Sequence, residues 1–168
     1  MTASYPDEGV PGKVLTDRRV IVVEATTADA FRAVANLGGD NGWYAWNWLW
    51  KLRAWLDSLF GGVGMRRSGS RRAPLAIGDE VDFWRVEALV PNQLIRLRAE
   101  MSVPGDAWLE FDISSDGVRS TVRQTATFIP HGLFGRLYWF SVFPFHQLVF
   151  RGLLRGIARA ALRDRRAS

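Results

Sequence analysis

Two histidines, His131 and His146, are the only imidazole side chains in the sequence, which has no cysteine. Ser141 lies five residues from His146, but no G-x-S-x-G motif is present, so a serine nucleophile beside a histidine base is not indicated. The histidines also lack the H-E-x-x-H spacing of zinc enzymes. We therefore expect neither a catalytic triad nor a metal site.

Acid–base catalysis is the type of chemistry that the sequence leaves open. Tyr138 and His146 lie in the aromatic stretch LFGRLYWFSVFPFHQLVF, residues 133–150. An apolar cavity can shift the pKa of such groups enough for them to exchange a proton with an enol. A histidine near a helix start also commonly hydrogen-bonds to backbone, which is the structural alternative. Tyr138 and His146 are thus weak candidates for the acid or base of an enzyme.

The residues that could contact a ligand are organised by a set of strands. From Gly78 onward, apolar and polar residues alternate, which predicts antiparallel strands over 80–90, 94–101, 107–113 and 120–129. Turn residues such as Asp116-Gly117 separate them. If Leu89 is opposite Leu94, one face of the sheet is apolar.

Gln124 is the exception on this apolar face. A buried amide must find hydrogen-bond partners, so we expect it to hold a backbone group or a water, or to orient a ligand. Glu110 falls on the opposite face, across from Arg123, which argues against a role inside a cavity.

Two helices are expected between the first strand, 18–24, and this sheet. The first covers 28–37 and begins with the capping-box pattern Thr26-x-x-Asp29. The second, over about 46–60, carries tryptophans on more than one side. It would form the rim of a cavity, or it would be sandwiched in the core or in a dimer interface.

The C-terminal region is expected to be helical in two pieces, 132–142 and 144–163, with Pro144 beginning the second. Arginines recur every four residues in the second piece, opposite an apolar side, at Arg151, Arg155, Arg159 and Arg163. We interpret them as the solvated face of a helix packed on the sheet; an anionic membrane is the less favoured alternative.

Composition bounds the class of protein. The chain has 168 residues, 48% of them hydrophobic, and a formal charge of +5, which suits one globular domain. The N-terminus has no secretory signal pattern and no apolar run reaches the roughly 20 residues of a membrane span, so we expect a cytoplasmic protein. The basic loop 65–74 has no interleaved aromatic residues, and nucleic-acid binding is not expected.

The order of strand, two helices, antiparallel strands and long C-terminal helix is that of the α+β helix-grip fold. The stretches GDEVDFWRVEALVPNQLIRLRAEM, PGDAWLEF, RQTATFIPHGLFGRLYWF and PFHQLVFRGLLRGIA resemble an uncharacterised bacterial domain of the START and polyketide-cyclase-like (SRPBCC) superfamily. That domain is often fused C-terminal to an NAD(P)-binding short-chain-dehydrogenase-like domain. The resemblance implies a curved sheet wrapped around the last helix and a cavity for a hydrophobic ligand. It supplies no catalytic residues.

The chain lacks a dinucleotide-binding G-x-G-x-x-G motif, so we assign no cofactor. We expect a flexible arm at 1–16, one helix-grip domain at 17–164 and a basic tail at 165–168. The function expected is binding of a hydrophobic or aromatic small molecule between sheet and C-terminal helix, contacted by Trp43, Tyr44, Trp46, Trp84, Leu97, Met101, Phe111, Gln124, Tyr138 and His146. The alternative is a cyclase- or dehydratase-like enzyme that uses Tyr138 or His146 in the same cavity.

A weaker alternative is a homodimer, or a subunit for a separate oxidoreductase. Its docking surface would include exposed tryptophans, Trp48 and Trp108.

Overall fold

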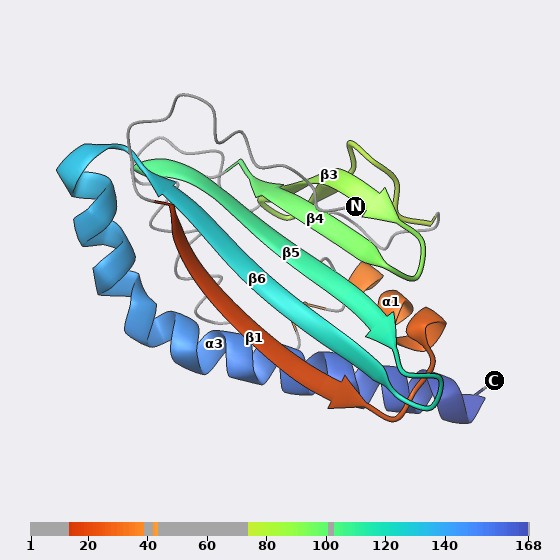
Figure 1. Cartoon of the computed structure of the whole chain (residues 1–168). Coiled ribbons are helices and arrows are strands. Elements are labelled where there is room, and N and C mark those ends of the chain that lie inside the picture. Colours follow the sequence, from red (N-terminus) through yellow and green to blue (C-terminus); the bar gives the residue numbers. More distant parts are fainter. Residues whose placement is uncertain (1–13, 39–41, 44–73, 101–102, 168) are drawn as a thin grey trace.

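A computed structural model describes residues 14–38, 42–43, 74–100 and 103–167 (Figure 1). Strand β1 (Leu15–Val23) precedes helix α1 (Thr27–Ala35), and the chain ends in helix α3 (Gly132–Ala167). Between them lie the other strands: β2 (Glu80–Val81), β3 (Trp84–Val90), β4 (Leu94–Ala99), β5 (Gly105–Ser115) and β6 (Ser120–Pro130). Regular structure therefore extends past both ends of the expected span 17–164. The helix expected over 46–60 lies outside the described residues.

The six strands form one antiparallel sheet in the order β1-β6-β5-β4-β3-β2. The sheet curves, and α3 runs along it beside β1, with α1 near the C-terminal end of α3 (Figure 1). Both helices contribute to one apolar cluster with the same face of the sheet, which we call the inner face. This arrangement is the helix-grip fold of the α+β class, as the sequence predicted.

The predicted β5–β6 hairpin and the residues that share its inner face are confirmed, although the register differs by two residues from one that puts Glu110 opposite Arg123. Leu109 pairs with Ala126, Phe111 with Gln124, and Ile113 with Val122. The turn between the strands is stabilised by the Asp116 carboxylate, which accepts hydrogen bonds from the backbone N–H groups of the two residues after Gly117. Alternation along these strands places Gln124 on the inner face, as expected.

The prediction for β3 and β4 is correct at one end of the hairpin and wrong at the other. Trp84 pairs with Ala99 and Val86 with Leu97, as predicted, but an irregularity at Glu87 shifts the register so that Leu89 faces Ile95. A β-bulge adds one residue to a strand and so reverses the side-chain alternation beyond it. Leu89 therefore packs against the core, where the sequence placed Ala88.

The single strand expected over 80–90 is divided into β2 and β3 by a tight turn. Asp82 in this turn has a φ of 58°, a left-handed conformation that aspartate adopts more readily than most residues. Its carboxylate also accepts a 2.8 Å hydrogen bond from the Trp43 indole N–H. The turn is thus tied to the segment that follows α1.

Helix α1 begins with the predicted capping box. The Thr26 hydroxyl oxygen accepts from the Asp29 backbone N–H, and the Asp29 carboxylate accepts from the Thr26 backbone N–H. The Thr26 hydroxyl also donates to this carboxylate over 2.7 Å, and this hydrogen bond is the main cause that lowers the pKa of Asp29. The box satisfies backbone donors that a helix start otherwise leaves unpaired.

Helix α3 is one helix, not the two pieces expected from Pro144, which lies inside it. Proline removes one backbone hydrogen bond and bends a helix without always ending it, and α3 changes direction along its length (Figure 1). Its first turn fits closely against the sheet, because a Cβ on Gly135 would lie 2.4 Å from the Pro104 carbonyl oxygen. Within the described part of the chain, no helix has the length and apolar character needed to cross a bilayer.

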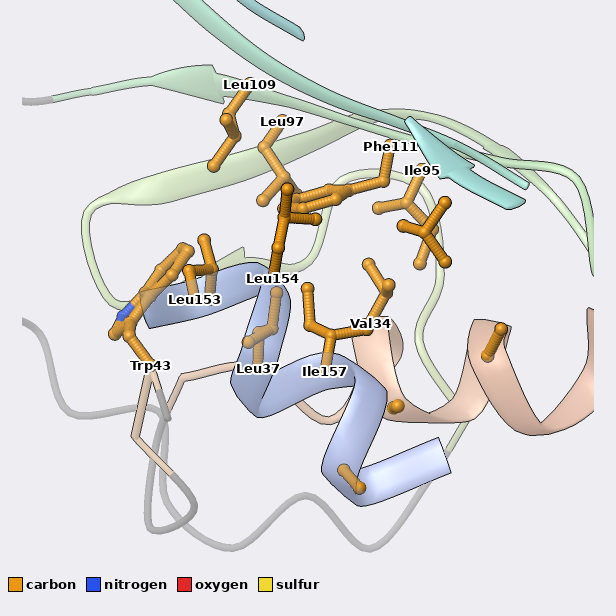
Figure 2. Packing of buried hydrophobic residues seen from close by; sticks show 14 of the residues in the cluster. Val34, Leu37, Trp43, Ile95, Leu97, Leu109, Phe111, Leu153, Leu154 and Ile157 are labelled. Atoms are coloured by element: carbon orange, nitrogen blue, oxygen red, sulfur yellow. The ribbon is translucent and has the colours of Figure 1, made fainter. Parts of the chain in front are cut away.

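The core lies between the inner face, α1 and the second half of α3. Figure 2 shows Phe111 and Ile95 of the sheet packed toward Val34 of α1 and Leu154 and Ile157 of α3. Phe111 and Ile157 are completely inaccessible to solvent. This half of the molecule is filled by its own side chains.

Candidate functional site

Gln124 is a polar side chain on the otherwise mainly apolar inner face of β6. It lies on β6 between Phe111 of β5 and Arg19 of β1, and only 1% of its surface is exposed. Among the described residues, neither the amide oxygen nor the amide nitrogen has a hydrogen-bond partner. Buried side-chain amides are nearly always hydrogen-bonded, so this unpaired amide is the feature of the inner face that calls for an explanation.

Arg19 connects the same region of the inner face to α3. Its guanidinium donates to the Asp17 carboxylate over 2.8 Å and to the Gln147 backbone carbonyl of α3 over 3.2 Å. It also lies 5.9 Å from the centre of the Phe150 ring, a cation–π distance. The third nitrogen, Nε, is buried without a partner. Asp17 and Arg19 are on the inner face because their cross-strand neighbours are Ala126 and Gln124.

Aromatic rings of α3 continue this region toward the start of the helix. The His146 ring stacks on Phe150 at 4.7 Å and meets the edge of Trp139 at 5.3 Å. Trp139 stacks on Phe128 of β6 at 5.7 Å, and Tyr138 is tilted against the same ring at 5.9 Å. Tyr138 and His146 therefore lie along one aromatic row between the helix and the sheet, with both side chains partly buried.

Trp43 and Trp84 form a second aromatic group, with Phe83 between the strands β2 and β3. The Trp43 ring stacks on Phe83 at 6.1 Å and is tilted against Trp84 at 6.3 Å. The Trp43 indole N–H is held by Asp82, whereas the Trp84 indole nitrogen is buried with no hydrogen-bond partner. Trp84 is thus a second inner-face donor without a partner in the part of the chain that the structure describes.

The remaining expected contact residues fall into two sets. Leu97 and Phe111 are buried in the packed core, at 3% and 0% exposure. Tyr44, Trp46 and Met101 lie outside the described residues. The structure thus brings Phe111 and Gln124 together. Trp43 and Trp84 lie in one aromatic group, and Tyr138 and His146 lie in another.

A groove of about 490 Å³ opens between β1 and α3. We call it the β1–α3 groove; its lining residues are Asp17, Arg18, Arg19, Val20, Ile21, Gln147, Arg151, Leu154 and Arg155. Asp17, Arg19 and Gln147, which join β1 to α3, form part of its wall. Arg151 and Arg155 are exposed, as expected for the arginine stripe, but they face this groove rather than open solvent alone.

The outer face of the sheet differs from the expectation in two respects. Glu110 lies on this face, as predicted, but it pairs across the strands with Thr125 and forms an ion pair with Arg96 at 2.9 Å, not with Arg123. Burial raises the pKa of Glu110 despite the nearby guanidinium. Trp108 was expected to be exposed, yet it is 7% exposed.

Trp108 is partly covered by Arg98, a residue of the neighbouring strand β4. The Arg98 guanidinium lies 6.0 Å from its ring centre, so the tryptophan is sheltered by a neighbouring side chain. Trp48, its expected companion, lies outside the described residues.

The residues of the β1–α3 groove that the sequence analysis did not single out are those of β1. Asp17, Arg18 and Arg19 form a charged run within a strand, and the alternation of the strand sends Asp17 and Arg19 inward. The signal was present as charged residues at the inner-face positions of an otherwise β-branched strand. It was overlooked because the strand was expected to begin at Arg18.

The comparisons with known proteins agree on the family and the fold. The sequence matches the family described as "Protein of unknown function (DUF2867)" over residues 10–153. No curated protein matches the sequence.

Similar solved structures include the Zhui aromatase/cyclase from Streptomyces sp. R1128, with a TM-score of 0.54, 12% identity and coverage of 90% of this chain and 95% of that chain. A protein from Chromobacterium violaceum has a TM-score of 0.50 and 14% identity, over 87% of this chain and 96% of that one. A protein from Thermus thermophilus has a TM-score of 0.50 and 15% identity, over 89% and 99%. At these identities the likeness concerns the fold. Because the family model spans most of the sequence, this chain belongs to the DUF2867 family, and its fold is the helix grip of the aromatase/cyclase-type structures.

Proposed function

We propose that the protein binds a hydrophobic or aromatic small molecule between the inner face of the sheet and α3, with Gln124 hydrogen-bonded to a polar atom of that molecule. The observation that carries this proposal is the Gln124 amide, buried at 1% exposure with both of its polar atoms unpaired. Of the ten contact residues expected from the sequence, the proposal uses Gln124, its neighbour Phe111, and Tyr138 and His146 of the aromatic row.

The chemistry of the surroundings fits such a ligand. A polar group buried without a partner costs about 1–3 kcal/mol, and a ligand that pairs with the amide recovers this free energy. The aromatic row formed by Trp139, His146 and Phe150 offers ring faces and edges for an apolar body. Small-molecule sites typically combine such apolar walls with a few polar groups that fix orientation.

The comparisons support the proposal at the level of class. The fold is shared with a protein whose description is aromatase/cyclase, and folds of one architecture often place ligands in the same region while differing in function. The identity of the ligand is left to experiment.

Native mass spectrometry of the purified full-length chain tests the proposal. We expect a copurified small molecule on the wild type and on Gln93→Leu, which makes the same chemical change at an exposed turn. We expect it to be reduced or lost in Gln124→Leu. A wild type without any adduct that also fails to bind an apolar fluorescent probe contradicts the proposal.

A second candidate function is a cyclase- or dehydratase-like reaction in the same space. His146 favours it, because its imidazole stacks on the Phe150 ring that also contacts Arg19, which places a titratable group beside the proposed ligand. Tyr138, on the same aromatic row, is the second candidate acid. If a molecule identified by mass spectrometry is turned over, His146→Ala should slow that reaction; an unchanged rate excludes His146 from the mechanism.

A third interpretation is an interaction subunit, either a homodimer or a partner of a separate NAD(P)-binding oxidoreductase in the cytoplasm. The exposed apolar residues of the first half of α3 are where a partner would dock; they include Leu133, Phe134, Leu137, Phe140 and Phe145. Light scattering of the purified chain distinguishes a monomer from a dimer. A monomer at high concentration excludes the homodimer.

A further inference from the structure

The β1–α3 groove has an excess of positive charge among the residues that line it. Four arginines and one aspartate are present, and the aspartate, Asp17, is already paired with Arg19 at 2.8 Å. Arg18 alternates with Asp17 and Arg19, so its side chain projects from the outer face of β1, where its charge acts on Glu110. The free positive charge of the groove is therefore that of Arg151 and Arg155, and within the described residues no ion pair involves either of them. Guanidinium groups gathered at a concave surface attract an anion, because each presents several N–H donors with a full charge.

The groove is also connected to the proposed ligand site through one residue. Arg19 lines the groove, lies opposite Gln124 on the neighbouring strand, and packs over the Phe150 ring. Its Nε is buried and unpaired, as is the Gln124 amide. Arg19 thus lies between the groove, which it lines, and Gln124, its neighbour on β6.

The size of the groove favours a small molecule over a macromolecule. A volume of about 490 Å³ lies within the range of roughly 300–1,000 Å³ that is usual for small-ligand sites. The inward-facing Ile21 of β1 and Leu154 of α3 are apolar residues of its lining, beside the charged ones, which suits a molecule that is anionic at one end and apolar at the other.

We propose that the ligand is an amphipathic organic acid, whose carboxylate or comparable anionic group binds in the β1–α3 groove against Arg151 and Arg155, and whose apolar body enters between the sheet and α3. The inference rests on the proposed function, because it specifies the chemical class of the same ligand. It also gives the arginine stripe of α3 two different roles. Arg151 and Arg155 bind the anion, while Arg159 and Arg163, which do not line the groove, are solvated.

A matched pair of fluorescent probes tests the proposal. Anilinonaphthalene sulfonate and N-phenylnaphthylamine share an apolar body and differ in the sulfonate. We expect the wild type to bind the anionic probe more tightly, and the advantage to shrink as salt is raised. The double variant Arg151→Ala, Arg155→Ala should weaken the anionic probe by about sixfold to thirtyfold, since each charge pair at 4 Å in water is worth about sixfold. It should leave binding of the neutral probe unchanged.

The control variant is Arg159→Ala, Arg163→Ala, which removes the same charge from the same helix outside the groove. Arg19 is not used, because it holds β1 to α3 and its loss would disturb the fold. Equal weakening by both double variants, or no preference for the anionic probe, overturns the inference while binding of the neutral probe upholds the proposed function. Failure of both probes to bind contradicts the proposed function itself. Competition by an acidic peptide but not by dodecanoate would assign the groove to a protein partner and overturn the small-molecule inference.

Discussion

Replacing Gln124 with leucine separates a binding role from a structural role. If the amide is reserved for a ligand, the ligand-free protein carries the cost of two buried and unpaired polar atoms. Leucine is close in size to glutamine and has no polar atom, so Gln124→Leu removes that cost while it keeps the side chain packed against Phe111. The variant should therefore be more stable than the wild type when no ligand is bound.

The magnitude follows from the burial of the residue. An unpaired buried amide costs about 1–3 kcal/mol, and Gln124 is 1% exposed, so nearly the whole cost applies. For a chain of this length, each kcal/mol moves Tm by about 2–4 °C. We expect the free energy of unfolding to rise by about 1–3 kcal/mol and Tm to rise by several degrees.

The assay is urea unfolding of both proteins after refolding from denaturant to remove bound molecules. Gln93→Leu, at an exposed turn, should change stability by less than about 0.5 kcal/mol. Adding the copurified molecule should then reverse the order, because a ligand stabilises only the protein that binds it. A loss of more than about 1 kcal/mol in ligand-free Gln124→Leu would refute the reasoning, since it would mean that the amide is satisfied within the fold.

Three further predictions concern the scaffold. Thr26→Ala should lower the free energy of unfolding by about 1 kcal/mol. Because the Thr26 hydroxyl lowers the pKa of Asp29, this difference between wild type and variant should be full above about pH 4 and should shrink as the pH falls through that lowered pKa. Urea unfolding measures it, and a difference that grows in acid contradicts the prediction. Burial raises the pKa of Glu110, so the wild type should lose stability relative to Glu110→Gln as the pH rises through that pKa toward 7. If the difference in free energy of unfolding between the two proteins does not change with pH, Arg96 compensates the burial and the prediction is wrong. Gly135→Ala should lower the free energy of unfolding by about 1–3 kcal/mol, as in other overpacked sites, because the new Cβ meets the Pro104 carbonyl oxygen; an unchanged Tm would mean that the first turn of α3 moves freely.

Regular hairpins were the part of the fold that the sequence predicted best. The alternation through Leu109, Phe111 and Ile113 has one register with all apolar residues inward, and a turn at Asp116-Gly117 enforces it. The β3–β4 register could not be predicted in full, because a bulge at Glu87 changes the alternation without a glycine or proline to mark it.

The helices show where local patterns are insufficient. Pro144 suggested a break, but contacts with the sheet on both sides of it in the sequence, Trp139 with Phe128 and Gln147 with Arg19, accompany one continuous helix. Tertiary packing overrode a local preference, as it commonly does in helices.

Single residues of the candidate site could be predicted from the sequence, but the contacts between its strands and α3 could not. Gln124 stood out because one amide interrupts an apolar face, and this position is confirmed. The meeting of Arg19 with Gln147 and Phe150 depends on how α3 crosses β1, which no residue spacing encodes. For the same reason the arginine stripe could be placed on a helix face but not beside a groove.

The most direct measurement of the central claim is a crystal structure of the protein with its copurified molecule bound. We predict a polar atom of that molecule within hydrogen-bond distance of the Gln124 amide, and its apolar body against the aromatic row of α3. The claim is contradicted if the amide is hydrogen-bonded to protein groups and ordered water in a filled interior while the molecule lies elsewhere.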